Sequence, residues 1–146
     1  MANQAVDILL VEDDPNDVEL TLRALTKHVA ASHIEVARDG AEALERLLGA
    51  ESPQRLETLP RLVLLDLKLP KMNGSEVLRA LRGDPRTKTM PVVVLTSSRE
   101  DRDISECYEI GANSYIVKPV DFSQFSEVVR QLGLYWLSLN ELGARG

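Results

Sequence analysis

Apolar residues along the chain gather in five short runs, separated by longer segments of mixed polarity. Within each run the apolar residues are continuous rather than alternating, which is typical of strands buried on both faces of a parallel sheet. The segments between the runs are long enough for the crossover helices that parallel strands require. We therefore predict five strands: Val6 to Val11, His33 to Ala37, Leu62 to Leu65, Val92 to Leu95 and Tyr115 to Val117.

Each run is followed by a segment with helical spacing of apolar residues. Asp14 and Pro15 are typical of an N-cap and first helical residue, and Asp17 adds negative charge to that first turn. Gly83 and Gly111 are expected at the ends of the third and fourth helices. The alternation predicts an α/β fold with a doubly wound five-stranded parallel sheet, flavodoxin-like, of order 2-1-3-4-5. The residues expected on the buried helix faces are Val18, Leu22, Leu25, Val29, Ala41, Leu44, Leu47, Leu48, Val77, Leu78, Leu81, Ile104, Cys107, Tyr108 and Ile110.

The last helix is expected to begin near Asp121, and it carries more apolar residues than one core-facing stripe needs. The excess continues to Leu139. We predict a domain over residues 1–132 and an extension of the last helix over residues 133–146. Tyr135 and Trp136 have two open interpretations: they pack against their own domain, or they form an interface with another molecule.

Composition narrows the function classes. The 146 residues fit one domain, and the net charge of -6, with 17 scattered basic residues, argues against nucleic acid or an anionic membrane as the main partner. No apolar run approaches a membrane span and no signal-peptide pattern opens the chain, so a cytoplasmic protein is expected. The single Cys107 excludes an intramolecular disulfide, and His28 and His33 lack a third soft metal ligand.

Polar residues that can carry chemistry follow the predicted strands. Ligand sites in such folds lie beyond the carboxyl ends of the strands, at the switch point of the strand order. Glu12 and Asp13 follow the first strand and Asp66 the third. Their carboxylates would repel one another unless a cation joined them, and Mg²⁺ suits oxygen ligands of this kind. Helix capping is the alternative role for acids at strand ends, and we assign it to Asp14.

Asp66 directly follows a fully apolar strand, where a carboxylate is costly unless it is used or paired. A carboxylate there can act as a nucleophile and become an aspartyl phosphate. Thr96 after the fourth strand and Lys118 after the fifth would supply the hydrogen bond and the positive charge that phosphoryl transfer requires. The ordinary alternatives are a strand residue for Thr96, a surface lysine for Lys118 and core packing for Tyr115.

Four segments carrying these residues resemble the receiver domain of two-component response regulators: Ile8 to Asp14, Leu65 to Gly74, Val94 to Ser97 and Ile116 to Pro119. All four occur in order, and the resemblance covers about Val6 to Leu132.

The resemblance implies a role for each site residue. Asp66 would be the phosphoacceptor. Asp13 would bind Mg²⁺ directly and Glu12 would bind it through water, with the backbone carbonyl of Lys68 as a further ligand. Thr96 and Lys118 would hold the phosphoryl group, with a cis bond between Lys118 and Pro119, and Tyr115 would be a conformational switch coupled to Thr96.

The long loop Gly49 to Pro60 and the extended last helix resemble the small single-domain regulators paired with bacterial phytochrome histidine kinases. That likeness implies a sensor histidine kinase of the phytochrome type as phosphoryl donor and a homodimer through the last helix. The protein would signal by protein–protein interaction and would catalyse only its own phosphorylation and dephosphorylation.

Three other functions compete with this interpretation. An aspartate-nucleophile phosphatase uses similar groups, but its general acid would stand at the position of Lys68 and its nucleophile on the first strand. A receiver-like scaffold that is never phosphorylated is disfavoured by the full set of site residues. The acids after the first strand disfavour a flavin module.

Overall fold

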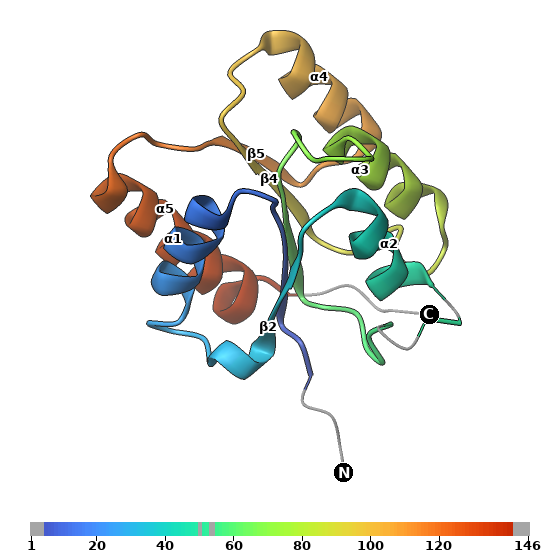
Figure 1. Ribbon diagram of the computed structural model, residues 1–146, viewed down its shortest axis with the longest axis horizontal. Helices are drawn as coiled ribbons and strands as arrows, with labels where there is room; N and C mark the ends of the chain where they lie inside the picture. The colour runs from blue at the N-terminus through green and yellow to red at the C-terminus, as the bar shows by residue number, and fades with distance from the viewer. Residues whose placement is uncertain (1–4, 50, 53–54, 142–146) are drawn as a thin grey trace.

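The five predicted strands form one parallel sheet in the order β2-β1-β3-β4-β5, as the sequence predicts. The structure is a computed structural model that describes residues 5–49, 51–52 and 55–141. Its strands are short, at four or five residues each (Figure 1). They are β1 (Ile8–Val11), β2 (Ile34–Ala37), β3 (Leu62–Leu65), β4 (Val92–Thr96) and β5 (Ser114–Val117).

The three central strands β1, β3 and β4 are buried at every residue, which explains their lack of polar alternation. The register sets their carboxyl ends side by side, with Val11 opposite Leu65 and Leu65 opposite Val94. Residues that directly follow these strands therefore meet at one edge of the sheet.

Helices alternate with the strands, and most begin at a side-chain cap. Asp14 caps α1 (Pro15–Leu25), Asp39 caps α2 (Gly40–Leu48) and Asn73 caps α3 (Gly74–Gly83). The fourth helix, α4 (Asp101–Ile110), ends at Gly111, whose φ of 127° is a conformation that favours glycine. The predicted caps Asp14 and Gly111 are confirmed. Two residues expected on buried helix faces are exposed: Tyr108 of α4, at 49%, and Ala41 of α2.

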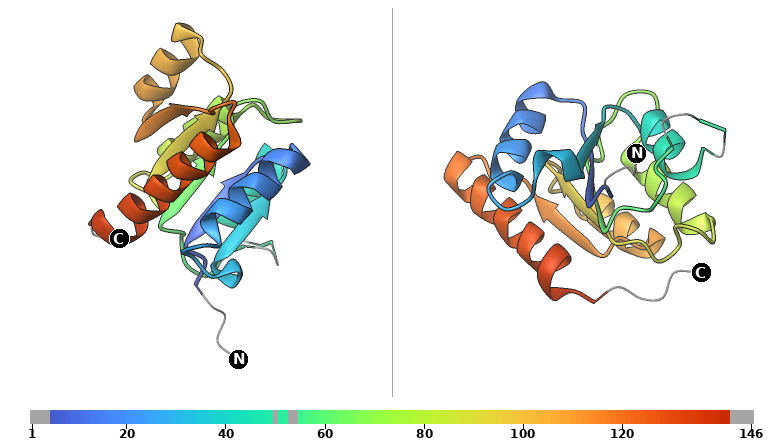
Figure 2. Two further views of the ribbon diagram at one scale, coloured as in Figure 1. Left: turned by 90° about the vertical axis from the view of Figure 1, so that its left-hand side faces the viewer. Right: turned by 90° about the horizontal axis from the view of Figure 1, so that it is seen from below.

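The helices cover the sheet in two layers. α1 and α5 (Phe122–Leu134) lie side by side on one face, while α2, α3 and α4 cover the other (Figures 1 and 2). Each layer has its own apolar core, and the residues of the central strands alternate between the two cores.

The last helix continues past Leu134 as a π-helical turn, Tyr135–Leu139, so the predicted extension is helical through Leu139. The predicted boundary after Leu132 falls inside α5, and residues 142–146 lie outside the described part of the chain. Trp136 is buried in the core between the sheet and α5, whereas Leu134, Tyr135 and Leu139 are 48%, 50% and 64% exposed. The two residues therefore differ. Trp136 packs against its own domain, whereas Tyr135 is half exposed at the surface.

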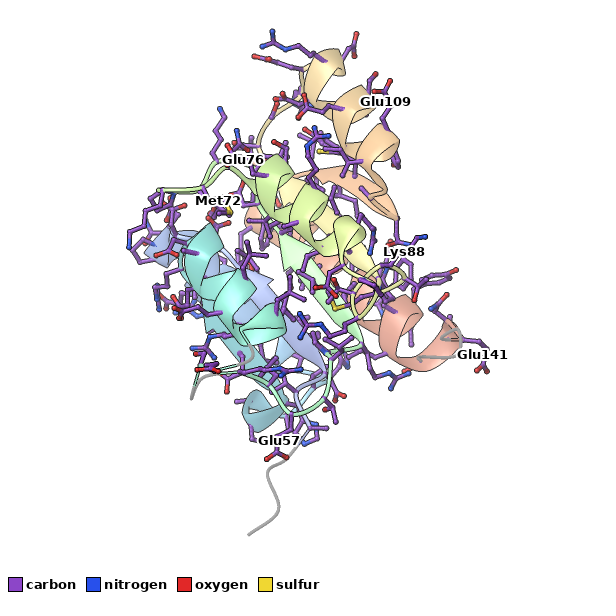
Figure 3. All side chains as sticks on the ribbon, turned by 90° about the vertical axis from the view of Figure 1, so that its right-hand side faces the viewer. Glu57, Met72, Glu76, Lys88, Glu109 and Glu141 are labelled. Atoms are coloured by element: carbon purple, nitrogen blue, oxygen red, sulfur yellow. The ribbon has the colours of Figure 1, made fainter. Side chains whose placement is uncertain are left out.

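The loop between β3 and α3 lies against the start of α2. Met72 packs at Gly40, where a Cβ atom would lie 2.8 Å from the Met72 Cβ, and Lys71 Nζ lies 3.5 Å from Asp39 Oδ2. Figure 3 shows Met72 above the first turn of α2 and beside the start of α3. The loop that follows Asp66 is thus packed in place.

Among the described residues no helix combines the length and apolar character that a membrane crossing needs.

Candidate functional site

The carboxyl ends of the strands bring Glu12, Asp66, Thr96 and Lys118 together. The backbone fixes their positions: the Asp66 N–H donates to Val11 O at 3.1 Å, and the Lys118 N–H donates to Thr96 O at 2.7 Å. These bonds continue the strand ladders by one residue. Four side chains from four segments therefore point into one small region at the edge of the sheet.

Lys118 is the electrostatic centre of this region. Its ammonium Nζ lies 2.5 Å from Glu12 Oε1, 2.8 Å from Asp17 Oδ2 and 2.9 Å from Asp66 Oδ2. Only 9% of its side chain is exposed. Burial by itself would lower the pKa of Lys118, but the hydrogen bonds that its ammonium donates to the three carboxylates outweigh burial and raise it. The lysine is therefore charged at any physiological pH.

Asp66 is held by three donors. Besides Lys118, its Oδ1 accepts a hydrogen bond from the Thr96 hydroxyl at 2.8 Å and from the Lys68 N–H at 3.2 Å. Burial raises the pKa of Asp66, but the hydrogen bond and positive charge of Lys118 more than offset it, so the pKa lies below the ordinary value. Asp66 is therefore an ionised carboxylate, which is the form required of a nucleophile.

Glu12 has the opposite shift. Its side chain is 4% exposed, and this burial raises its pKa to about 7, against the lowering effect of Lys118, with the charge of Asp66 adding to the rise. Its Oε2 accepts a hydrogen bond from the Asp14 N–H at 3.2 Å. Glu12 thus takes up a proton easily at neutral pH unless a further cation approaches.

The sequence interpretation missed Asp17, which the structure places in this cluster in addition to the expected acids. Asp17 lies in the first turn of α1, the helix that directly follows β1. This place in the sequence was the signal that could have included Asp17 among the candidate site residues. Asp13 is exposed and makes no hydrogen bond or ion pair with the described residues, so the structure does not bring it into the cluster.

The expected cis bond between Lys118 and Pro119 is wrong, because every peptide bond in the described residues is trans. The trans form is the lower-energy one even before proline, and the trans chain already places the Lys118 ammonium among the acids. No special backbone geometry is needed to direct this side chain.

A chain of contacts leads from Thr96 toward α4 and β5. The Ser98 hydroxyl donates to Asp103 Oδ2 at 2.6 Å, and the Tyr115 hydroxyl donates to the Ser98 carbonyl at 3.0 Å. Ser98 is two residues beyond Thr96 and is buried. The structure therefore connects Thr96 and Tyr115, the two expected switch residues, through the segment that follows β4.

The donor set of the cluster fits a hard divalent cation. Glu12, Asp17 and Asp66 each offer a carboxylate oxygen, and these oxygens lie within 4.8 Å of one another. Glu12 and Asp66 are buried, where uncompensated carboxylates are costly.

Comparisons with known proteins show the family that this chain matches. Residues 8–130 match the sequence model of the family described as the response regulator receiver domain. The probable methanogenesis regulatory protein FilR2 of Methanothrix harundinacea is 42% identical over 133 residues, covering 91% of this chain and 84% of FilR2. The response regulator Rcp1 of Synechocystis sp. is 34% identical over 137 residues, covering 94% of this chain and 92% of Rcp1.

Solved structures of related proteins have the same fold. The crystal structure of the phosphorylated cyanobacterial phytochrome response regulator RcpA matches with a TM-score of 0.87 and 37% identity, covering 97% of this chain and 100% of RcpA. The structure of Rcp1 in its Mn²⁺-bound form matches with a TM-score of 0.83 and 34% identity, covering 95% of this chain and 99% of Rcp1.

Proposed function

Because the chain belongs to the response regulator receiver family, we propose that it is a phosphorylation switch with Asp66 as its phosphoacceptor. The observation that carries the proposal is the setting of Asp66, an ionised carboxylate held between the Thr96 hydroxyl and the Lys118 ammonium. Family membership implies a sensor histidine kinase as the phosphoryl donor. A carboxylate oxygen of Asp66 attacks the phosphorus of the phosphohistidine, the phosphorus–nitrogen bond breaks, and an acyl phosphate forms.

Thr96 and Lys118 are placed to hold the transferred group. In this proposal the Thr96 hydroxyl turns from Asp66 Oδ1 to donate to a phosphoryl oxygen, and the Lys118 ammonium forms an ion pair with another. Both groups contact Asp66 before the reaction and therefore lie beside the place where the transferred group forms.

The proposed metal is Mg²⁺, held by Asp66, Asp13, Glu12 through water, and the backbone carbonyl of Lys68. The acidic cluster supports a divalent cation, and the related Rcp1 has been solved with Mn²⁺. Bound Mg²⁺ would neutralise charge on the phosphoryl oxygens during transfer. Asp13, which is exposed beside Glu12, and the Lys68 carbonyl are the proposed ligands that the acidic cluster does not include.

The proposed output is a change at Tyr115. When Thr96 turns to the phosphoryl group, the segment through Ser98 shifts, and Tyr115 loses or changes its hydrogen bond to the Ser98 carbonyl. Since Tyr115 is half-buried on the edge strand β5, its movement alters the surface formed by α4, β5 and α5.

Phosphorylation with a small donor tests this function directly. We expect acetyl phosphate and a magnesium salt to produce a labile phosphoryl adduct, visible by intact mass, on the wild type and on Asp84→Asn. Asp84 is a matched control, since it is an aspartate at the opposite end of α3 paired with Arg86. Asp66→Asn should give no adduct. An adduct on Asp66→Asn, or none on the folded wild type, would remove Asp66 from its role.

The proposed donor is a histidine kinase of the phytochrome type, acting on this protein in the cytoplasm. The likeness to RcpA supports this pairing. We expect phosphotransfer from a purified bacteriophytochrome kinase to be faster, by at least about tenfold, than transfer from a histidine kinase without a phytochrome module. The FilR2 relative is named for another process, so the likeness to FilR2 does not favour a phytochrome kinase. Equal rates from both kinases would reject the pairing.

A further inference from the structure

The ammonium of Lys118 occupies the centre of the acidic cluster. Three carboxylates lie within 2.9 Å of Nζ, and their oxygens are the same groups that could hold a metal ion. Lys118 and a divalent cation therefore compete for the same negative charges. A cation that is bound directly by Asp66 and through water by Glu12 would weaken the contact of both carboxylates with the ammonium.

Asp17 differs from the other two partners of Lys118. Its side chain is 31% exposed, against 4% for Glu12 and 10% for Asp66, so it lies at the outer side of the cluster. It also comes from a helix rather than a strand end. The Asp17 N–H donates to the capping Asp14 Oδ1 at 3.3 Å, and the Asp17 carbonyl accepts from the Thr21 hydroxyl at 2.7 Å, so its position is fixed within α1.

We propose that Asp17 is a positioning residue. It holds the Lys118 ammonium in place when Asp66 binds a divalent cation directly and Glu12 binds it through water. The inference rests on the proposed function and extends it to Asp17, a residue outside the expected ligand set. With Asp17 in place, Lys118 keeps one carboxylate partner 2.8 Å away and stays beside Asp66, ready for a phosphoryl oxygen. Without Asp17, the lysine would have no carboxylate partner besides the two that also serve the cation.

The consequence is a change in cation affinity that passes through Lys118. In Asp17→Asn, displacing the ammonium leaves a poorly exposed charge without a carboxylate partner, and this cost opposes cation binding. We expect the dissociation constant for Mg²⁺ to rise by about three- to tenfold, a usual range for groups in direct contact. Asp17→Glu, which keeps the charge, should restore most of the affinity.

A double-mutant cycle distinguishes this role from direct metal ligation. Mg²⁺ binding is measured by isothermal titration calorimetry on the wild type, Asp17→Asn, Lys118→Met and the double variant, in the absence of any phosphoryl donor. If Asp17 acts by retaining Lys118, its substitution weakens binding in the wild type and has little effect in Lys118→Met. An equal loss of affinity in both backgrounds would show that Asp17 acts on the cation directly and would overturn the proposal.

Glu19→Gln is the matched control, because it removes the same charge from α1 but pairs with Arg23 on the exposed side. Glu19→Gln should leave Mg²⁺ affinity unchanged. A loss equal to that of Asp17→Asn would mean that any negative charge on α1 has the same effect, and it would reject the proposal. Circular dichroism establishes that each variant is folded. The cycle measures cation binding alone, so failure of Asp66 phosphorylation would leave its outcome interpretable.

Discussion

At the scale of single residues, the site is governed by one lysine shared among three acids. Lys118 satisfies Asp66 well enough to lower the pKa of that carboxyl, but the more deeply buried Glu12 has its pKa raised to about 7 by burial. The two acids thus differ in charge state near neutral pH although both contact the same ammonium. This division keeps Asp66 available as a nucleophile and makes Glu12 sensitive to protons and cations.

The raised pKa of Glu12 predicts a pH dependence of stability. The pKa is 4.5 in the unfolded chain and about 7 in the fold, so the folded state binds more protons between these values. The free energy of unfolding of the metal-free protein should therefore fall as pH rises from 5 to 7, by about 1–2 kcal/mol from this residue. Asp66, with its lowered pKa, loses its stabilising effect only in more acidic solution and acts outside this window.

Urea denaturation with a chelator present, at several pH values between 5 and 7, measures this effect. Glu12→Gln carries no titrating proton, so its stability should fall less over the same range. Addition of millimolar magnesium should flatten the wild-type slope, because the cation stabilises the ionised carboxylate. Identical slopes for the wild type and Glu12→Gln would contradict the assigned pKa.

At the scale of elements, the loop from β3 to α3 sets the position of Asp66. Gly74, the first residue of α3, donates its N–H to Leu67 O at 2.8 Å, which folds the helix start back onto the residue after Asp66. A Cβ atom at Gly74 would overlap Asp66 O and lie 2.7 Å from Leu67 Cα. Both are backbone atoms that cannot move independently of Asp66, so only glycine allows this close approach.

Gly74→Ala should therefore both destabilise the fold and displace Asp66. We expect a loss of about 2–4 kcal/mol in the free energy of unfolding, in the range of overpacked interiors, and at least about a tenfold slower reaction with acetyl phosphate. Urea denaturation and the rate of adduct formation measure the two effects. Gly83→Ala is the control on the same helix, because nothing lies within 4 Å of its Cβ position. It should be neutral or slightly stabilising, and equal effects of the two substitutions would refute the packing argument.

At the scale of the whole molecule, the two helical layers leave an apolar surface at the end of α5. Leu134, Tyr135 and Leu139 are exposed there, although Trp136 beside them is buried. The Tyr135 and Trp136 rings pack edge to face with centroids 5.1 Å apart, which orders the surface. We propose that a homodimer forms through this end of the last helix, the described part of the predicted extension over residues 133–146.

Light scattering coupled to size-exclusion chromatography tests the dimer. The wild type should elute as a dimer at micromolar concentration, and Leu139→Asp should shift it to a monomer. Since Leu139 is 64% exposed, the substitution should change the stability of the monomer by less than about 0.5 kcal/mol. Val120→Asp alters a fully exposed residue before α5 and should remain dimeric. A monomeric wild type, or equal dissociation by both variants, would reject the interface.

The strands, the sheet order and four of the side chains that meet at the sheet edge could be predicted from the amino-acid sequence. This was possible because strands buried on both faces must be continuously apolar, and the residues that follow parallel strands must meet at one edge. Asp66, Glu12, Thr96 and Lys118 are therefore found from their places after apolar runs, and Asp14 and Gly111 from local capping chemistry.

Features that depend on the packing of one element against another could be seen only in the folded structure. The position of Asp17 over the strand ends follows from how α1 packs on the sheet, and the exposure of Asp13 follows from the direction of the chain entering α1. The opposite pKa shifts of Glu12 and Asp66 depend on burial and on a shared lysine 106 residues away from Glu12. Trp136 is buried and Tyr135 is half exposed because of the side of the helix that faces the core. Apolar residues lie all round this helix, so the sequence pattern does not specify that side.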